Sequence, residues 1–203
     1  MRSFYPEQLA HGDVYRLLTG ALVPRPIAWV STLNEDGSFN LAPFSFFTAV
    51  SSDPPILAVA ISRRTNGEKK DSLLNIERTG QFVVNIADDR LSREVQISGR
   101  DLPYGESEFT AAGLSASPSE RVAPPRVSEA PVAMECQACG ERVDYGRKPY
   151  TLVLGEVVAL HFRDDIVTPA GRTLFEVFRP LGRLAGKMYA RFGAVIDEEA
   201  VPR

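Results

Sequence analysis

The chain has 203 residues, of which 44% are hydrophobic and 24% are charged. This is the composition of an ordinary globular protein, and it excludes intrinsic disorder and collagen-like repeats. The 23 basic and 26 acidic side chains give a formal net charge of −3, too balanced for the broad positive field that nucleic acid or an anionic membrane attracts. We therefore expect neither nucleic acid nor a membrane among the partners.

The length favours one domain over two, so we expect a single domain spanning 1–203, with a C-terminal extension after about residue 180. No apolar run approaches the length of a membrane span, and residues 1–10 lack the apolar centre of a secretory signal. We therefore expect a cytoplasmic protein. Its only cysteines, Cys136 and Cys139, exclude a disulfide framework.

The first sixty residues predict β-strands separated by turns. Asp36-Gly37 is typical of a tight hairpin turn because both residues tolerate a positive φ. The Asp-Pro-Pro sequence at 53–55 cannot continue a strand ladder and must turn. Four strands are therefore expected as a β-meander, at 27–33, 39–41, 44–50 and 56–62.

The next segments alternate between short helices and strands. Asp71 is a candidate N-cap for a helix that ends at Thr79-Gly80, where glycine can take the left-handed conformation. Asp88 is a candidate cap for a second short helix that ends at Gly99. Further strands are expected at 81–87, 132–138 and 150–162.

The segment 99–131 is rich in Pro, Ser, Gly and Glu, which predicts a long surface excursion. Structureless loops of this length are uncommon, so we expect either a helical turn near 106–112 or a role in a site or an interface. Because strands outnumber the short helices, the predicted fold class is mainly β. The pattern favours a closed antiparallel barrel decorated by a few short helices over a doubly wound sheet.

Several common chemistries lack their motifs. No G-x-G-x-x-G follows a strand, and the segment 182–187 is one residue short of a phosphate loop. Cys136 and Cys139 should point to opposite faces of a strand, and with only His11 and His161 elsewhere they cannot complete a zinc site. No G-x-S-x-G or H-E-x-x-H motif indicates a hydrolase. We expect no metal.

Two segments concentrate polar groups next to strand ends. Segment 40–48 interleaves aromatic residues with Asn, Ser and Thr, which combines hydrogen-bond groups with flat apolar surface. Segment 62–72 gathers four cations and several hydroxyl groups ahead of a predicted helix N-terminus, which suits a phosphate monoester. A solvated loop is the other interpretation of 62–72. Core or dimer contacts are the other interpretation of the aromatic residues, above all of Phe46, because strand alternation turns it away from Ser45.

Six segments share their order and spacing with one known family: PRPIAWVST at 24–32, NLAPFSFF at 40–47, SSDPP at 51–55, KDSLLNI at 70–76, GQFVVN at 80–85 and GEVVALH at 155–161. Together they resemble the flavin reductase-like, FMN-binding family that includes flavoredoxin. The resemblance covers about residues 24–189, nearly the whole chain. It implies an antiparallel Greek-key split β-barrel that binds FMN non-covalently in a homodimer, with the cofactor pockets near the subunit boundary.

The resemblance also implies roles for the two polar segments. The expected phosphate ligands are Ser62, Arg64, Lys70 and Ser72, with Ser31 or Thr32. Asp71 would cap the helix or touch the ribityl hydroxyls. The isoalloxazine ring is expected against 42–48, where backbone N–H groups and the Ser45 hydroxyl bond it and tune its potential. The full set of expected cofactor-binding residues is Ser31, Thr32, Asn40, Ala42, Pro43, Phe44, Ser45, Phe47, Thr48, Ser62, Arg63, Arg64, Lys70, Asp71 and Ser72.

Two residues have expected roles near the reacting atoms. A lone histidine on a strand is most often structural, but the resemblance puts His161 near the flavin, where it would orient the donor or supply a proton. Tyr189 resembles an aromatic residue beside the flavin in longer members of the family. A tyrosine at the dimer interface is the other interpretation.

The resemblance implies an oxidoreductase that uses bound FMN to pass a hydride or electrons from NAD(P)H to a flavin, to oxygen, or to a partner such as a monooxygenase or redox protein. Two alternatives remain. One is an FMN-binding electron carrier of the flavoredoxin type that does not use NAD(P)H. The other is a flavin-free binding barrel.

Overall fold

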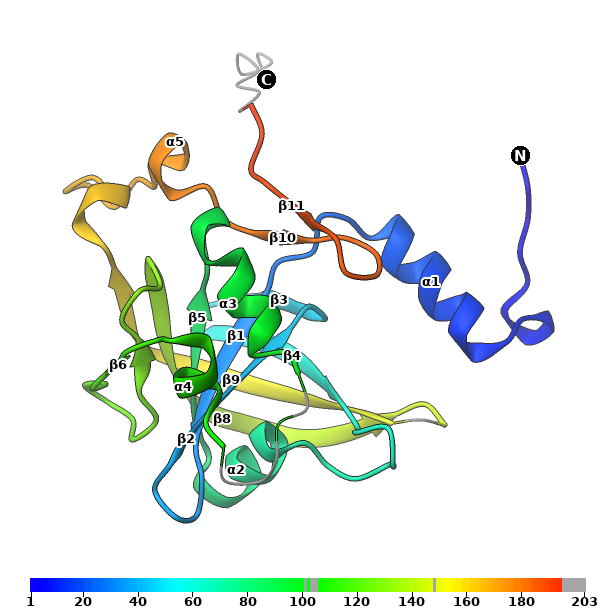
Figure 1. The fold of residues 1–203 in the computed structure, drawn as a ribbon, viewed down its shortest axis with the longest axis horizontal. Coiled ribbons are helices and arrows are strands. Elements are labelled where there is room, and N and C mark those ends of the chain that lie inside the picture. Colours follow the sequence, from blue (N-terminus) through cyan, green and yellow to red (C-terminus); the bar gives the residue numbers. More distant parts are fainter. Residues whose placement is uncertain (101, 103–105, 148, 195–203) are drawn as a thin grey trace.

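The structure is a computed structural model, and it describes residues 1–100, 102, 106–147 and 149–194. A seven-stranded antiparallel sheet forms the body of the molecule (Figure 1), as the mainly β prediction expects. Its strands are β1 (Ala28–Leu33), β2 (Phe39–Phe44), β3 (Phe47–Ser52), β4 (Pro55–Ser62), β5 (Gln81–Ile86), β8 (Val132–Tyr145) and β9 (Tyr150–Phe162). They lie in the order β2-β1-β5-β8-β9-β4-β3.

The sheet closes on itself because its two edge strands follow one another in the chain. β2 ends at Phe44 and β3 begins at Phe47, so only three Cα–Cα steps of about 3.8 Å join opposite edges of the sheet. The backbone N–H of Ala60 in β4 donates to the carbonyl of Phe46 at 2.8 Å and ties this corner to the sheet. A flat sheet could not satisfy this connection, so the strands curl into a barrel.

Apolar side chains from the strands fill the barrel, and helix α2 (Asp71–Thr79) contributes Leu73 and Ile76 to this core. The helix ends at Gly80 in the left-handed conformation, with a φ of 67°, as predicted. The predicted capping role of Asp71 is wrong. Lys70 occupies the N-cap, no side chain caps the helix, and Asp71 is the first helical residue.

The remaining helices are short. They are α1 (His11–Ala21), α3 (Ser92–Ile97), α4 (Glu108–Ala112) and α5 (Phe175–Phe178), with 3₁₀ turns η1 (Pro6–Gln8), η2 (Asp89–Leu91) and η3 (Asp164–Ile166). The predicted second helix is η2 followed by α3, and Asp88 Oδ1 accepts from the N–H of Arg90 as its predicted cap. No helix in the described ranges combines the length and the apolar character that crossing a membrane requires.

The predicted excursion 99–131 has structure of its own in its described part. α4 lies at the expected helical turn, and it is followed by the paired strands β6 (Ala116–Ser117) and β7 (Arg126–Val127). Residues 101 and 103–105 of the excursion lie outside the described residues. The excursion packs the buried side chains of Phe109 and Val127 against Trp29 and Leu41 of the barrel.

Two segments outside the barrel frame the region described next. Helix α1, for which the sequence carried no prediction, projects from the body as an arm (Figure 1). The small hairpin of β10 (Gly182–Arg183) and β11 (Tyr189–Ala190) runs from the barrel toward this arm. Arg25, between α1 and β1, pairs with Arg183 through two backbone hydrogen bonds of 2.9 and 2.8 Å.

Two predictions for the first sixty residues are wrong. The run 44–50 is not one strand, because it breaks at Ser45 and Phe46 between β2 and β3. The strands do not form a meander, because β2 and β3 lie at opposite edges of the sheet. The break also turns Ser45 and Phe46 toward the same cavity, whereas strand alternation predicts that they face apart.

Candidate functional site

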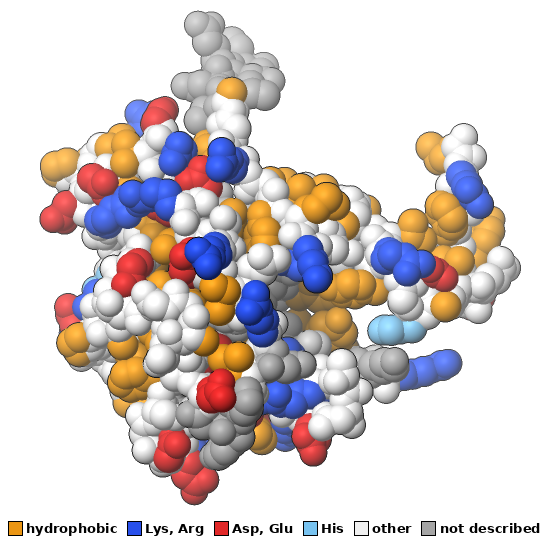
Figure 2. All heavy atoms as spheres, viewed as in Figure 1, with side chains coloured by type: hydrophobic (Ala, Val, Ile, Leu, Met, Phe, Trp, Pro, Cys, Tyr) orange, Lys and Arg blue, Asp and Glu red, His pale blue; other side chains and the backbone are white. Residues whose placement is uncertain are grey.

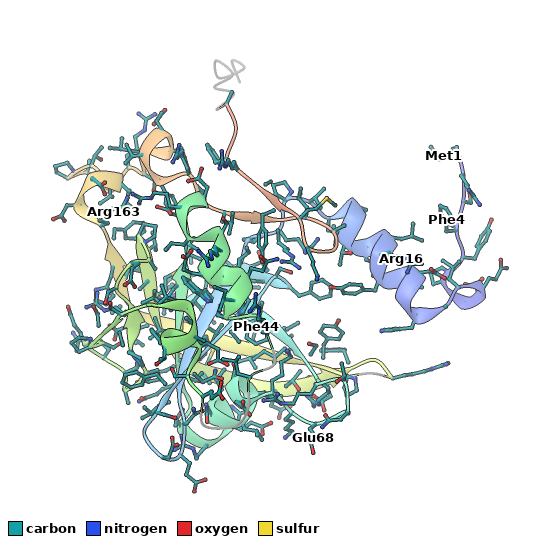
Figure 3. The ribbon with its side chains drawn as sticks, in the orientation of Figure 1. Met1, Phe4, Arg16, Phe44, Glu68 and Arg163 are labelled. Carbon is teal, nitrogen blue, oxygen red and sulfur yellow. The ribbon has the colours of Figure 1, made fainter. Side chains whose placement is uncertain are left out.

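A cavity of about 470 Å³ opens where the β2–β3 corner meets α3, the β10–β11 hairpin and α1. Its volume lies within the range of pockets that bind cofactors and other small molecules. Figure 2 shows a hollow between the body and the α1 arm, with Lys and Arg side chains beside it. Figure 3 shows Phe44, one of the lining residues, in the middle of the molecule on the side that faces this arm.

A smaller hollow of about 60 Å³ continues from the cavity toward the N-terminus of α2. The two share Pro43, Lys70, Gly99 and Arg100 in their linings, so they form one continuous site. We call the smaller hollow the side arm. The predicted residues that line the site are Asn40, Ala42, Pro43, Phe44, Ser45, Ser62, Arg64, Lys70, Asp71, Ser72 and Tyr189. The structure therefore brings together most members of two segments that are separate in the sequence.

The charges are distributed unevenly along this site. Among the described residues, the larger cavity is lined by Lys70, Arg100, Arg183 and Lys187 and by no carboxylate. The carboxylates that reach the site, Asp71, Glu106 and Glu108, all line the side arm. The cavity therefore favours an anionic ligand.

The protein engages two of the three carboxylates of the side arm, Asp71 and Glu108. Arg64 donates to Asp71 Oδ2 at 2.5 Å. Glu108 Oε2 accepts the backbone N–H of Leu41 at 2.9 Å, and burial raises the pKa of Glu108 above its ordinary value. Both contacts hold the side arm in shape at the junction of β2, α2 and α4.

The polar groups next to the side arm form a buried cluster. Asn40 Nδ2 donates to Thr32 Oγ1 at 3.0 Å and to Ser72 Oγ at 2.9 Å. Asn75 of α2 donates to the same Thr32 oxygen at 3.0 Å. Because Thr32 is fully buried and lines neither hollow, it acts here as an acceptor that holds Asn40 and α2 in place.

Ser45 lies at the corner and faces the larger cavity. Its hydroxyl oxygen accepts from Arg25 Nε at 3.3 Å. The Arg25 side chain is buried, with 7% of its surface exposed, and burial lowers the pKa of its guanidinium below the ordinary value. A buried arginine therefore adjoins the predicted ring-binding hydroxyl.

Aromatic side chains form one wall of the cavity. Phe46 stacks on Tyr150 at the start of β9 with ring centroids 5.4 Å apart, and Tyr15 from α1 lies 6.4 Å from Phe46. Burial, and then the neighbouring Tyr15, raise the pKa of Tyr150. On another side, Arg183 lies over the Tyr189 ring at 4.6 Å from its centroid.

Besides Thr32, four predicted cofactor-binding residues line neither hollow. Ser31 Oγ donates to the carbonyl of Pro125 at 2.5 Å. Arg63 bonds Thr151 at 2.6 Å and forms an ion pair with Asp144 at 2.8 Å. Phe47 packs against the main core, and Thr48 is exposed on β3. Cofactor contacts by these residues stay predictions.

His161 also lies apart from the cavity lining. Its Nε2 atom is 2.7 Å from Oε1 of Glu135, a carboxylate with no exposed surface. The Glu135 oxygens also accept backbone N–H groups of Glu120, Arg121 and Val122 at 2.8, 2.6 and 3.2 Å. The structure thus pairs His161 with Glu135 of β8, which in turn holds the excursion 99–131, and the predicted role of His161 beside the flavin stays a prediction.

Several lining residues were missed by the sequence analysis. They come from α1, from α3 and the residues just after it, and from the β10–β11 hairpin, and they are Tyr15, Gln96, Arg100, Arg183 and Lys187. The basic residues after position 180 could have indicated these positions, because Arg183 and Lys187 lie shortly before the predicted Tyr189. Gln96 and Arg100 had no signal of their own, because only the folded chain brings α3 to the corner.

No group of three His, Cys, Asp or Glu side chains in the described part of the chain gathers as a metal-ligand set. Cys136 and Cys139 are free thiols. Burial raises the pKa of the Cys136 thiol to about 12, which keeps it protonated and unreactive.

The chain is similar in sequence to known proteins. Residues 20–181 match the family model described as a flavin reductase like domain. The protein YwrF of Bacillus subtilis is 38% identical over 199 residues, which cover 95% of this chain and 96% of that protein.

Solved structures are similar to this chain in their fold. Component B of nitrilotriacetate monooxygenase from Bacillus cereus is 35% identical, with a TM-score of 0.92 over 98% of both chains. A protein of Shewanella frigidimarina with a split barrel domain has a TM-score of 0.85 at 18% identity, over 99% of this chain and 100% of that one. The predicted split β-barrel is confirmed.

Proposed function

Because the chain belongs to the flavin reductase-like family, we propose that it is an oxidoreductase that binds FMN and passes electrons from NAD(P)H to a flavin, to oxygen or to a redox partner. One observation carries this proposal. The corner at 43–45 and the basic segment 62–72 are far apart in the sequence, yet they line one continuous site. A ligand with a planar ring and an anionic tail suits this combination.

The chemistry of the lining fits FMN. Ile27 and Phe44 line the cavity with apolar side chains that suit a flat ring, and Ser45 lines the same cavity with a hydroxyl. Lys70 and Arg100 line both the cavity and the side arm, so either hollow places a phosphate beside two cations. The combination of a ring and a phosphate tail therefore matches the combination of apolar and cationic groups in the lining.

The chain's own residues would do three things for such a ligand. Lys70 and Arg100 would bind the phosphate, and Ser45 would donate a hydrogen bond to the ring. Phe46 and Tyr150 would keep water from one side of the cavity. Bound FMN supplies the redox chemistry, since its ring accepts a hydride and releases electrons. Binding, orientation and exclusion of water are left to the protein.

We also propose a partner protein that uses the reduced flavin. The relative with a TM-score of 0.92 is named as one component of a monooxygenase, which supports an exchange of reduced flavin with a second protein. A monooxygenase or another redox protein is therefore the partner class to test.

A homodimer is part of the same proposal. α1 leaves Tyr15, Leu17, Leu18 and the following Leu22 between 40% and 59% exposed, which is a large apolar surface for one short helix. In Figure 3, Arg16 lies on this helix, and Met1 and Phe4 lie beyond it, away from the barrel. A second copy would cover this surface, and because Tyr15 lines the cavity, dimerisation would also shape the site.

The test uses the purified full-length chain with FMN. We expect a bound-flavin absorption spectrum and anaerobic bleaching when NADH or NADPH is added, together with a dimer by light scattering. If the protein binds FMN and accepts electrons from a redox protein, but neither NADH nor NADPH reduces it, it is an electron carrier of the flavoredoxin type. A protein that binds no flavin overturns the proposal.

A further inference from the structure

Arg25 joins three parts of the molecule at the edge of the cavity. Its Nη1 atom donates to the carbonyl of Thr19 at 2.6 Å and to that of Leu22 at 2.9 Å, at the C-terminal end of α1. Its Nη2 atom donates to the carbonyl of Leu184 at 2.9 Å, in the β10–β11 hairpin. Its Nε atom donates to Ser45 Oγ at the β2–β3 corner.

The buried charge of Arg25 is matched by backbone carbonyls. No carboxylate among the described residues makes an ion pair with it, and Arg183 nearby carries the same charge. The carbonyls at the C-terminus of a helix carry partial negative charge, so the end of α1 stabilises the guanidinium. With these acceptors fixed, the direction of the Nε–H group toward Ser45 is fixed as well.

This arrangement leaves the Ser45 hydroxyl hydrogen free to donate toward the cavity. A guanidinium has five N–H donors and no acceptor, so in this contact the serine oxygen must accept. The hydroxyl hydrogen of Ser45 is then left to point elsewhere, and no acceptor for it is recorded in the described part of the chain. Because Ser45 lines the cavity, this hydrogen is available to a ligand there.

We propose that Arg25 is a positioning residue that makes Ser45 a hydrogen-bond donor toward the flavin ring and thereby favours reduced over oxidised FMN. The inference rests on the proposed function, since it assigns a role toward the proposed cofactor. Reduction adds electrons to the ring, and a fixed donor interacts more strongly with a ring that has gained negative charge. Arg25 itself need not touch the ligand.

Lysine at position 25 separates the hydrogen bond from the charge. In a lysine side chain a methylene group stands where arginine has Nε, so Arg25→Lys keeps a positive charge and removes the donor that contacts Ser45. If only the charge of Arg25 mattered, the lysine variant would hold reduced and oxidised FMN in the same ratio as the parent protein.

The experiment measures the affinities of oxidised FMN and of anaerobically reduced FMN, with the reduction potential of the bound flavin as a second readout. For Ser45→Ala we expect the preference for reduced FMN to fall about tenfold. A tenfold change in this ratio lowers the two-electron potential by about 30 mV. For Arg25→Lys we expect a fall of similar size.

The double variant completes the test. If Arg25 acts through Ser45, then Arg25→Lys adds no further change in the preference when Ser45 is already alanine. Arg172→Lys, on an exposed turn between η3 and α5 that lines neither hollow, is the matched control and should leave both affinities unchanged.

Three results separate the outcomes. Additive effects in the double variant, or an unchanged preference in Ser45→Ala, overturn the inference while FMN binding stands. A parent protein that binds neither form of FMN overturns the proposed function itself. Ser45→Ala removes only one partly exposed hydroxyl, so we expect this variant to fold even where the buried Arg25 variant is unstable.

Discussion

The two sides of the barrel differ in how far their polar groups are bonded within the protein. On one side, Glu135 is fully buried, and its carboxylate is satisfied by three backbone N–H groups and by His161. On the other side, Ser45, Lys70 and Arg100 line a cavity, and no ion pair with another described residue engages either cation. Both sides are polar, but only one has donors left for a ligand.

This difference separates a structural network from a binding site. A buried carboxylate whose acceptor positions are all filled stabilises the segment that supplies the donors, and it leaves nothing for a ligand. Cations and hydroxyls around a cavity contribute little to the fold, but they bind an anion strongly once it is desolvated. Four changes test whether the two sides differ in this way.

The largest effect is expected from Glu135→Ala. The change leaves three backbone N–H groups of the excursion 99–131 without their acceptor, so we expect the free energy of unfolding to fall by about 3–5 kcal/mol. Urea denaturation measures it. Glu141→Ala, at an exposed position of β8, is the control and should change stability by less than about 0.5 kcal/mol. A loss near the control value would mean that the network contributes little.

The next largest effect is expected on the cavity side. Lys70→Met combined with Arg100→Met should weaken FMN binding about 100-fold, because each cation lost removes about one factor of ten from the phosphate site. The free energy of unfolding without ligand should stay within about 1 kcal/mol of the parent value. Fluorescence titration gives the affinity, with Arg172→Met, at an exposed position away from the cavity, as the control. Unchanged affinity would move the phosphate away from these residues.

A smaller effect is expected for His161→Asn. The change removes one partner of Glu135 and keeps the backbone donors, so we expect a loss of about 1–2 kcal/mol in stability. FMN affinity and the rate of flavin reduction should stay near the parent values, because His161 does not line the cavity. A slow reduction step in a fully folded variant would support the role that the family resemblance predicts.

The smallest effect is a difference in pH dependence. Although burial by itself raises the pKa of Glu135, hydrogen bonds from Glu120, Arg121 and His161 outweigh it and hold the pKa below its ordinary value. The carboxylate therefore adds stability above the unfolded-state pKa of about 4.3, and this is lost as the pH falls through the lower folded-state pKa. Between about pH 5 and pH 3, Glu135→Gln should lose less stability than the parent protein. Urea denaturation at several pH values measures the free energy of unfolding of both proteins. An equal loss of stability in the two proteins would contradict this prediction.

Much of the fold could be predicted from local sequence. Asp36-Gly37 is the turn between β1 and β2, β9 has the predicted bounds, and Gly80 ends α2 with a positive φ. Such features depend on residues that are neighbours in the chain, because turn chemistry and the alternation of side chains are local properties. The family resemblance also came from local segments, and it led to the residues of 40–48 and 62–72 that line the site.

Other features depend on contacts that no local pattern reports. A side chain at Gly155, within the GEV segment, would lie 2.3 Å from the Phe82 ring, so the glycine is required by packing between distant strands. Phe46 faces the cavity because β2 and β3 leave the same corner toward opposite edges of the sheet. Local alternation predicted the reverse.

The sequence by itself determined most of the strands, the main helix stop, the family and the two polar segments of the site. Only the tertiary structure decided that Arg25 reaches Ser45, that α3 and the β10–β11 hairpin complete the cavity, and that His161 contacts Glu135. The reason is physical. Propensity and turn chemistry act over a few residues, whereas barrel closure and the satisfaction of buried polar groups depend on which distant segments come to lie side by side.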